Sequence, residues 1–386
     1  MALLLRVLHV SPSFFPATYW GGPVQSLRSL CNATAARGDI EIRVLTTDTA
    51  GSRTRERLIV DESVRSSLPY AVTYARKSFG VAISAELLTS LWSNCVWADV
   101  VHLTGVYSFP TIPTIAVCRV LGKPLVWSPR GALQRWPGAR QLAMKFVWER
   151  VCDLLLDRRR TVLHFSSQAE LDSSTGRIRN AGMQVLAHGV DIPQAPPGRV
   201  WRPDGVLRLI YIGRLDPIKG ITNLITALTE CLSVRWRLRI CGTGEPSYVK
   251  RLNMEVAKAG LSERTTFVGH VDGERKAEEF FGADVCVVPS FSESFGMVVA
   301  EALSHGIPVI ASRGTPWPEL ESRKCGLWVE NSPHAIKSAL EEIAARDLEA
   351  MGTEGRKWMV EKFGWNAVAS QMASLYLEMR RAKSGD

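Results

Sequence analysis

The chain has 386 residues and a net charge of +9, and it is 46% hydrophobic and 22% charged. This length suits two domains rather than one core, and the composition is that of a globular protein without low-complexity or disordered segments. No apolar run approaches the roughly 20 residues of a membrane-spanning helix. The eight cysteines have neither a zinc-ligand spacing nor a CxxC pair, which predicts buried, reduced thiols in a cytoplasmic protein.

The apolar start of the chain, "MALLLRVLHV", has some character of a secretion signal. Arg6 interrupts the run, however, and no small-x-small cleavage site follows it. We therefore expect a first core strand here.

Short, almost continuously apolar runs in the first half are typical of strands buried on both faces of a parallel sheet. Helical-period stretches such as Pro23–Arg37 and Ala139–Asp157 separate most of them, which is the pattern of βαβ units. The strands are expected at Leu4–Val10, Glu41–Thr46, Ala71–Ala75, Asp99–Leu103, Pro124–Trp127, Thr161–Phe165 and Gln184–Ala187.

The segment Asp191–Gly205 contains four prolines and two glycines and has little periodicity, so it is the best linker in the chain. After it the alternation of strand and helix resumes. Strands are expected at Leu207–Ile212, Leu238–Cys241, Thr265–Val268, Val285–Pro289 and Pro308–Ala311. We therefore predict an α/β protein with a first domain at 1–192, a linker at 193–205 and a second domain at 206–364.

The last helix is predicted at Trp365–Arg380, where apolar residues recur at helical spacing. It packs either on its own domain or back on the first one.

Ligands of parallel sheets bind at the carboxyl ends of strands, close to helix N-termini. In "SPSFFPATYWGGPVQSL", Gly21 and Gly22 lie between a strand and a helix, where a backbone without Cβ atoms admits a phosphate. A tight glycine turn explains these two residues equally well. The same holds for Gly189 and Asp191 in "LAHGVDIP", beside the predicted hinge.

In "YIGRLDPIKGITNLI", Arg214 and Lys219 follow a strand and precede a helix, so they place two cations where a diphosphate would bind. The alternative is ordinary loop charge.

In "SFSESFGMVVAEALSHG", Glu293 lies in a loop and Glu301 lies eight residues later, in a predicted helix. Carboxylates are suitable acceptors for sugar and ribose hydroxyls, although Glu293 alone could simply complement the helix dipole. Phe295, Gly296 and Met297 offer the free N–H groups of the first helical turn.

"GRLDPIKG", followed by "ESFGMVVAE", resembles the retaining glycosyltransferase family 4, part of the glycosyl transferases group 1, and the resemblance covers essentially the whole chain. "DVVHLTG", "HGVDI" and the closing "FGWNAVASQMASLYLEM" also match this family. The resemblance implies a GT-B fold: two Rossmann-like domains facing a cleft, with the closing helix 365–386 crossing back to the first domain. The first domain would then bind the acceptor and the second the nucleotide sugar.

The resemblance also implies roles for residues that match the family motifs. Arg214 and Lys219 match the cations on the donor diphosphate, Glu293 the residue that holds the donor sugar, and Glu301 the residue that binds the ribose. The backbone that contacts donor sugar and phosphate corresponds to Phe295, Gly296, Met297, Gly21 and Gly22.

One position departs from the family pattern. Where many members have a histidine, "SPRGAL" has Arg130, which is permanently charged and cannot act as a base. It would instead pair with an anionic acceptor or with the donor diphosphate. His102, in "DVVHLTG", is either a polar cleft residue or a core histidine.

Positive charge is concentrated in the first half, where residues 1–192 hold 22 Lys and Arg against 14 Asp and Glu. This excess suggests an anionic partner, which is a phospholipid surface, a diphosphate-linked acceptor or a nucleic acid. The stretch Gln134–Arg160 mixes aromatic and basic residues, and it is either an interfacial helix on anionic lipid or a core helix that ends in a solvated arginine run.

The expected function is transfer of a sugar from a nucleotide sugar to a glycan or lipid-linked glycan, with retention, in bacterial surface polysaccharide or glycoconjugate synthesis. No DxD motif occurs, so neither a metal nor another cofactor is implied. We expect a cytoplasmic enzyme, either free or peripheral on the inner face of the membrane, that does not bind nucleic acid. The alternatives are another GT-B enzyme, such as a sugar-nucleotide epimerase, or a non-catalytic scaffold subunit.

Overall fold

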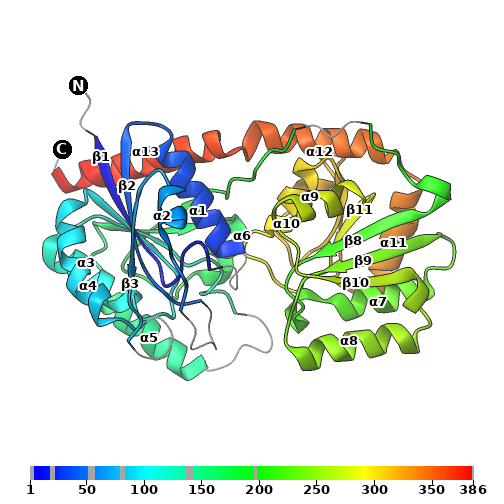
Figure 1. The fold of residues 1–386 in the computed structure, drawn as a ribbon, viewed down its shortest axis with the longest axis horizontal. Coiled ribbons are helices and arrows are strands. Elements are labelled where there is room, and N and C mark those ends of the chain that lie inside the picture. Colours follow the sequence, from blue (N-terminus) through cyan, green and yellow to red (C-terminus); the bar gives the residue numbers. More distant parts are fainter. Residues whose placement is uncertain are drawn as a thin grey trace. The chain divides into compact units, whose positions relative to one another are not determined.

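The computed structural model describes residues 4–17, 22–50, 57–78, 83–135, 142–194 and 198–384. It comprises two compact α/β units, shown in Figure 1. Unit 1 consists of Met1–Gly189 and Trp365–Asp386, and unit 2 of Val190–Gly364. The described residues of the predicted linker at 193–205 therefore belong to unit 2, which begins before them.

Unit 1 contains a seven-stranded parallel sheet with the strand order β3-β2-β1-β4-β5-β6-β7. Every strand that was predicted in the first half is present, with ends shifted by at most two residues. The strands are β1 (Leu5–Val10), β2 (Ile40–Thr47), β3 (Ala71–Ala75), β4 (Val100–Thr104), β5 (Leu125–Ser128), β6 (Thr161–Phe165) and β7 (Gly182–Val185).

Helices cover both faces of this sheet, because its strands are apolar on both sides. The core on one face joins β1 and β2 to α1 (Gly22–Ala35) and α13 (Trp365–Ser384). The core on the other face lies beneath α3 (Ala85–Trp97), α4 (Thr111–Leu121) and α5 (Leu142–Leu155). Two shorter helices, α2 (Glu62–Ser66) and α6 (Gln168–Ser174), complete the unit.

The closing helix α13 belongs to unit 1 although it follows unit 2 in the sequence (Figure 1). Its predicted apolar stripe is buried in the core of unit 1, with Val368, Met372, Leu375, Tyr376 and Met379 all at most 6% exposed. Of the two packings that the sequence allowed, the structure has the return to the first domain.

Unit 2 contains a six-stranded parallel sheet with the order β10-β9-β8-β11-β12-β13. Its strands are β8 (Leu207–Ile212), β9 (Trp236–Cys241), β10 (Thr265–Gly269), β11 (Val285–Val288), β12 (Val309–Ser312) and β13 (Gly326–Val329). Its helices are α7 (Ile221–Glu230), α8 (Pro246–Lys258), α9 (Gly273–Phe281), α10 (Met297–Ser304), α11 (Pro333–Ala344) and α12 (Leu348–Lys362). The sequence analysis did not predict β13.

All eight cysteines are buried and free, as their scattered spacing predicted. In the described part of the chain, no helix combines the length and the apolar character needed to cross a bilayer.

Candidate active site

Lys219 and Glu293, 74 positions apart in the sequence, are in contact at the carboxyl edge of the sheet in unit 2. Lys219 ends the short 3-10 helix Pro217–Lys219, which the Asp216 side chain caps by accepting a hydrogen bond from the N–H of Ile218. The Lys219 Nζ lies 2.6 Å from Glu293 Oε1, and Ser290 Oγ donates to the same oxygen at 2.7 Å. The structure thus joins two residues that the sequence assigned to the diphosphate and to the sugar.

Backbone hydrogen bonds fix the loop that carries Glu293. The Glu293 N–H donates to Gly314 O at 2.9 Å, and the Phe291 N–H donates to Ile218 O at 2.8 Å. The side chains of Lys219 and Glu293 remain 19% and 15% exposed. The ion pair is therefore sheltered from bulk water but still accessible to a ligand.

Arg214 lies in the loop before Lys219, and its side chain is 67% exposed. Its guanidinium is 3.9 Å from Asp216, and its carbonyl accepts a hydrogen bond from the Tyr211 hydroxyl. The backbone of Arg214 is held in place, whereas its charged end extends into solvent.

Glu301 has a lysine of its own. It lies in the second turn of α10, and its Oε1 is 2.6 Å from Nζ of Lys276 on α9. Sequence reasoning missed Lys276, because one lysine in the charged helix α9 carries no signal of its own. Each of the two predicted carboxylates is thus balanced by one lysine.

Phe295, Gly296 and Met297 form the start of α10, as predicted. Gly296 is the N-cap, in the left-handed region with a φ of +76°, and Met297 is the first helical residue. The Phe295 ring is buried against Trp317 at a centroid distance of 5.1 Å. Phe295 can therefore offer a ligand only its backbone.

Glycines allow the loops at this edge to pack backbone against backbone. A Cβ on Gly220 would overlap the carbonyl oxygen of Pro289, and one on Gly242 would overlap that of Gly213. Sequence reasoning missed Gly242 and Gly244, although "CGTGEP" directly follows β9 at the same edge and could have marked them.

Replacement of Gly242 with alanine is expected to destabilise unit 2 by about 3 kcal/mol, because the added Cβ combines a steric overlap with a φ of +145°. Chemical denaturation followed by circular dichroism measures this loss. Gly260→Ala is the matched control, because it also has a positive φ, of +70°, but no heavy atom within 4 Å of the added Cβ. Equal losses in the two variants would show that the overlap contributes nothing.

In unit 1, Gly21 lies outside the described residues, and Gly22 is the first residue of α1 and is exposed. Gly189 packs against the Trp365 ring, which a Cβ would overlap. Asp191 is exposed and lies outside any helix or strand. Because Gly21 lies outside the described residues, phosphate binding by the loop with Gly21 and Gly22 stays a prediction.

His102 is fully buried, and both of its ring nitrogens are hydrogen-bonded. Its Nδ1 is 2.6 Å from the Tyr376 hydroxyl of α13, and its Nε2 is 2.7 Å from Ser128 Oγ. The role of a core histidine, which the sequence left open, is the one that fits these contacts.

These contacts belong to a longer chain of hydrogen bonds through unit 1. His164 Nε2 can only donate to the Leu186 carbonyl, so its Nδ1 accepts from Ser128. For neutral rings, His102 Nε2 then donates to Ser128, and Tyr376 donates to His102 Nδ1. The Tyr376 oxygen is left to accept from His9 Nε2 at 3.4 Å. Each proton in the chain therefore has one consistent position.

Burial keeps these rings neutral. Desolvation, and then the charge of Arg130, lower the pKa of His9 to about 3 and that of His164 to about 3. Burial also lowers the pKa of His102 well below its ordinary value. At neutral pH the chain therefore consists of uncharged groups that anchor α13 to the sheet.

Arg130 follows β5 and contacts the buried ring of His188. It is one of the few residues other than glycine with a positive φ, of 56°. Its Nε and Nη2 are buried without a hydrogen-bond partner among the described residues. Burial lowers its pKa to about 10, so the guanidinium keeps its charge at neutral pH. Two buried donors on a cation are suited to donate hydrogen bonds to an oxyanion.

A family model described as "Glycosyl transferases group 1" matches residues 201–358, which span nearly all of unit 2. Unit 2 is a glycosyl transferases group 1 domain. The resemblance that the motifs indicated is thus confirmed for this domain, which contains both lysine–glutamate pairs.

The alignments of this chain with curated relatives are longer than the region that the family model matches. The chain is 30% identical over 264 residues to a D-inositol 3-phosphate glycosyltransferase of Corynebacterium efficiens, covering 61% of this chain and 60% of the relative. It is 28% identical over 209 residues to a glycogen synthase of Mycobacterium tuberculosis, covering 53% and 50%. The chain thus spans about half to three-fifths of the length of these relatives.

Solved structures confirm the predicted GT-B fold over almost the whole chain. Sucrose-phosphate synthase from Thermosynechococcus elongatus has a TM-score of 0.75 at 21% identity, covering 98% of this chain and all of that one. Anabaena Alr3699/HepE in complex with UDP has a TM-score of 0.73 at 18% identity, covering 97% and 100%.

Proposed function

We propose that the protein is a retaining glycosyltransferase that transfers a sugar from a nucleotide-diphosphate donor. The observation that carries this proposal is the pair of lysine–glutamate contacts in the group 1 domain, Lys219–Glu293 and Lys276–Glu301. Supporting it, Anabaena HepE, which shares the fold, was solved with UDP and with UDP-glucose.

In this proposal the cations bind the part of the donor that becomes negative. Lys219 lies in a sheltered site and Arg214 has an exposed guanidinium in the loop before it, so both can stabilise the departing diphosphate. Glu293 accepts hydrogen bonds from the sugar hydroxyls, and Glu301 from the ribose. Because Lys219 contacts Glu293, this lysine would orient the Glu293 carboxylate that binds the sugar, and it would also bind the adjacent phosphate of the donor.

The proposed reaction takes place on one face of the sugar. The bond between the anomeric carbon and the phosphate oxygen breaks, and a bond to the acceptor oxygen forms on the same face. The acceptor proton moves to the departing phosphate oxygen, so the protein need not supply a base. Metal independence and family 4 membership are part of this proposal, and they rest on the sequence motifs.

The acceptor is proposed to be a glycan or a lipid-linked glycan of bacterial surface polysaccharide or glycoconjugate synthesis. Arg130 supports an anionic acceptor, because its Nε and Nη2 are buried and unpaired among the described residues. We also propose that the enzyme is cytoplasmic and works peripherally at the inner face of the membrane, because the positive charge lies mainly in residues 1–192.

A thermal-shift screen of UDP, GDP, ADP and their sugars tests the donor site. A nucleotide at 100 times its dissociation constant adds about 2.7 kcal/mol of stability, which corresponds to a rise in Tm of roughly 5–10 °C. We expect the matching nucleotide to produce this rise in the wild type, and Glu301→Ala to reduce it. Glu354→Ala, at an exposed glutamate of α12, is the matched control.

Two results would contradict the proposal. If no nucleotide stabilises the wild type, the protein has no donor site of this kind. If nucleotide binds but Glu293→Ala releases nucleotide from the nucleotide sugar as fast as the wild type, the scaffold alternative replaces transfer.

A further inference from the structure

Helix α5 in unit 1 has the reverse of the usual distribution of side chains. Its buried residues are Glu149, Cys152 and Asp153, two of which are carboxylates. Carboxylates are rarely buried unless they are paired, and apolar side chains normally occupy that face. The buried acids therefore set the orientation of α5, and the apolar residues of the helix face outward.

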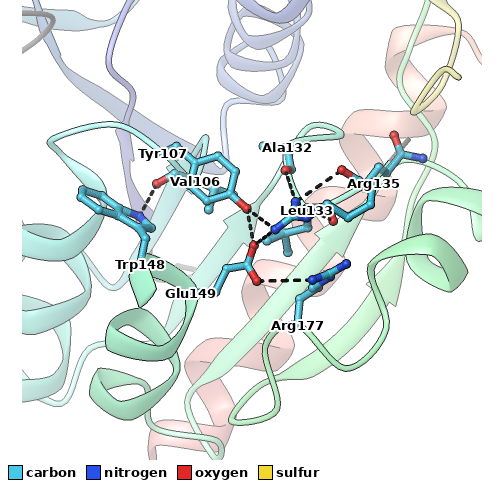
Figure 2. Close-up of polar contacts among 9 residues, drawn as sticks. Val106, Tyr107, Ala132, Leu133, Arg135, Trp148, Glu149 and Arg177 are labelled. Atoms are coloured by element: carbon cyan, nitrogen blue, oxygen red, sulfur yellow. Dashed lines mark hydrogen bonds and ion pairs between the residues drawn. The ribbon is translucent and has the colours of Figure 1, made fainter. Parts of the chain in front are cut away.

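Several partners compensate the charge of Glu149, which is 2% exposed (Figure 2). Arg135 and the Tyr107 hydroxyl both donate to its Oε1, and Arg177 lies 3.9 Å from its Oε2. Burial and the bond to Glu149 raise the pKa of Tyr107 to about 12, so the phenol remains a donor. Trp148 Nε1 donates to Val106 O at 2.8 Å and adds a further anchor.

Asp153 is fixed one helical turn later. Its Oδ1 accepts from the N–H of Arg179 at 2.7 Å and from that of Asn180 at 2.8 Å. Glu149 and Asp153 thus fix two successive turns on the same face of α5 to the body of unit 1. Loss of these contacts would leave buried charges without partners, so α5 cannot easily rotate to hide its apolar face.

The outward face of α5 is almost entirely apolar. Val147 and Leu154, seven residues apart and therefore on the same side of the helix, are 60% and 77% exposed. Leu142, Met144, Phe146 and Val151 are also exposed. The charged side chain among them is Arg150, which lies over the Phe146 ring at 5.0 Å.

The apolar surface continues onto the two neighbouring helices, which form one layer with α5 (Figure 1). On α3, Leu88, Trp92 and Val96 are exposed at spacings of four residues, and on α4 Val120 is 72% exposed. Basic side chains join the C-terminal ends of the three helices. Arg119 of α4 donates to carbonyls at the end of α5, and Lys123 donates to Val96 O and Ala98 O at the end of α3.

The charges around this surface are complementary to an anionic partner. Arg119, Arg150, Arg158 and Arg159 are exposed, whereas both carboxylates of α5 are buried. The neighbouring acids are occupied: Glu86 accepts from the Arg76 N–H, and Asp157 lies 3.6 Å from Arg160. A second copy of the chain would bring the same positive charges together. An anionic bilayer offers hydrocarbon for the apolar stripe and negative headgroups for the arginines.

We propose that the outward faces of α3, α4 and α5 form a docking surface for an anionic lipid bilayer, which includes the exposed Val147 and Leu154 of α5. This identifies the partner surface of the membrane association proposed above and rests on that proposal. It does not depend on the nucleotide site, which lies in unit 2.

Co-sedimentation with lipid vesicles tests the surface. We expect the wild type to pellet with phosphatidylglycerol–phosphatidylcholine vesicles at low salt and to stay in solution with phosphatidylcholine alone. The double variant V147E/L154E is expected to lower the bound fraction at least tenfold, because it places two carboxylates on the apolar face of α5. The matched control is L232E/V360E, which makes the same changes at two exposed apolar residues of unit 2.

Three outcomes would overturn the proposal. The wild type stays in solution with anionic vesicles, or V147E/L154E pellets as the wild type does. Alternatively, the wild type is a dimer by size-exclusion chromatography with light scattering, V147E/L154E is a monomer, and neither binds vesicles, in which case a second copy covers the surface.

The nucleotide thermal shift separates this proposal from the proposed function. V147E/L154E should retain the wild-type shift, because both changes lie in unit 1. If no nucleotide stabilises the wild type but vesicles still bind, the transfer proposal fails and the docking surface stands. If a nucleotide raises the Tm of the wild type but vesicles do not bind it, the docking surface fails and the transfer proposal stands.

Discussion

Replacing Lys219 with alanine is expected to lower the rate of sugar transfer by about 10²–10³-fold. This is the usual effect in enzymes of removing one preorganised group that stabilises developing negative charge. Lys219 is held 2.6 Å from Glu293 in a sheltered position, so it need not reorganise when the diphosphate departs. The exposed end of Arg214 can take over only part of this role. Nucleotide release from the donor that the thermal-shift screen identifies measures the effect.

The control for this variant is Lys250→Ala, which removes an exposed lysine from α8 of the same unit and should leave the rate unchanged. Ser290 still donates to Glu293 after the loss of Lys219, so the loop should remain folded, and the Tm of the variant checks this. A Lys219→Ala enzyme that keeps both the wild-type rate and the wild-type affinity for nucleotide would remove Lys219 from the mechanism.

Much of the proposed donor site could be predicted, because its residues lie close to the ends of strands. Lys219 follows β8 and Glu293 follows β11, and parallel strands bring their carboxyl ends to one edge. Their contact therefore follows from the strand order. Lys276 could not be predicted, because its approach to Glu301 depends on how α9 packs beside α10.

The hydrogen-bond chain of unit 1 was predictable only in part. His9 and His164 both lie near the ends of apolar runs, which places them close to the same edge of the sheet. The sequence does not state that β1, β4, β5 and β6 are neighbours in this order, nor that a tyrosine from α13 joins two of the histidines. These contacts come from topology and from the return of the last helix.

The residue types in Gln134–Arg160 could not decide whether this stretch is an interfacial helix or a core helix, and α5 shows why. Burial of apolar residues would have turned Val147 and Leu154 inward. Arg135 and Arg177 instead compensate the charge of Glu149, and backbone N–H groups bind Asp153. These contacts turn the acidic face of the helix inward and the apolar face outward. These partners come from separate loops, which the sequence of α5 does not identify. Trp136, part of the same stretch, lies outside the described residues.

The stability of unit 1 is expected to fall steeply as the pH is lowered through the range just below 6.5. The folded-state pKa values of His9 and His164 are about 3, whereas a histidine in the unfolded chain titrates near 6.5. Between these values the unfolded chain binds protons that the folded chain does not. The stabilisation is therefore complete above pH 6.5 and is lost progressively towards pH 3, by about 1.4 kcal/mol per pH unit for each buried histidine.

Denaturant unfolding at half-unit steps between pH 7.5 and 5, with hydrogen exchange to locate the loss in unit 1, measures this dependence. This window is chosen because most carboxylates titrate below it, so histidines dominate the slope. His164→Asn should reduce the slope by about 1.4 kcal/mol per pH unit, and His270→Asn, at a half-exposed histidine of unit 2, is the comparison variant.

The same titration tests the direction of the hydrogen bonds through unit 1. A proton added to His164 would turn its Nδ1 into a donor facing Ser128, whose hydroxyl proton would then lose its acceptor while its oxygen accepts from both His164 and His102. Protonation of His164 therefore leaves a buried hydroxyl donor unpaired and places a positive charge beside His102, and the destabilisation should spread through His102 to Tyr376 and α13. If stability stays flat from pH 6.5 to 5 while α13 keeps its protection from exchange, the folded rings accept protons freely and the chain does not anchor the helix.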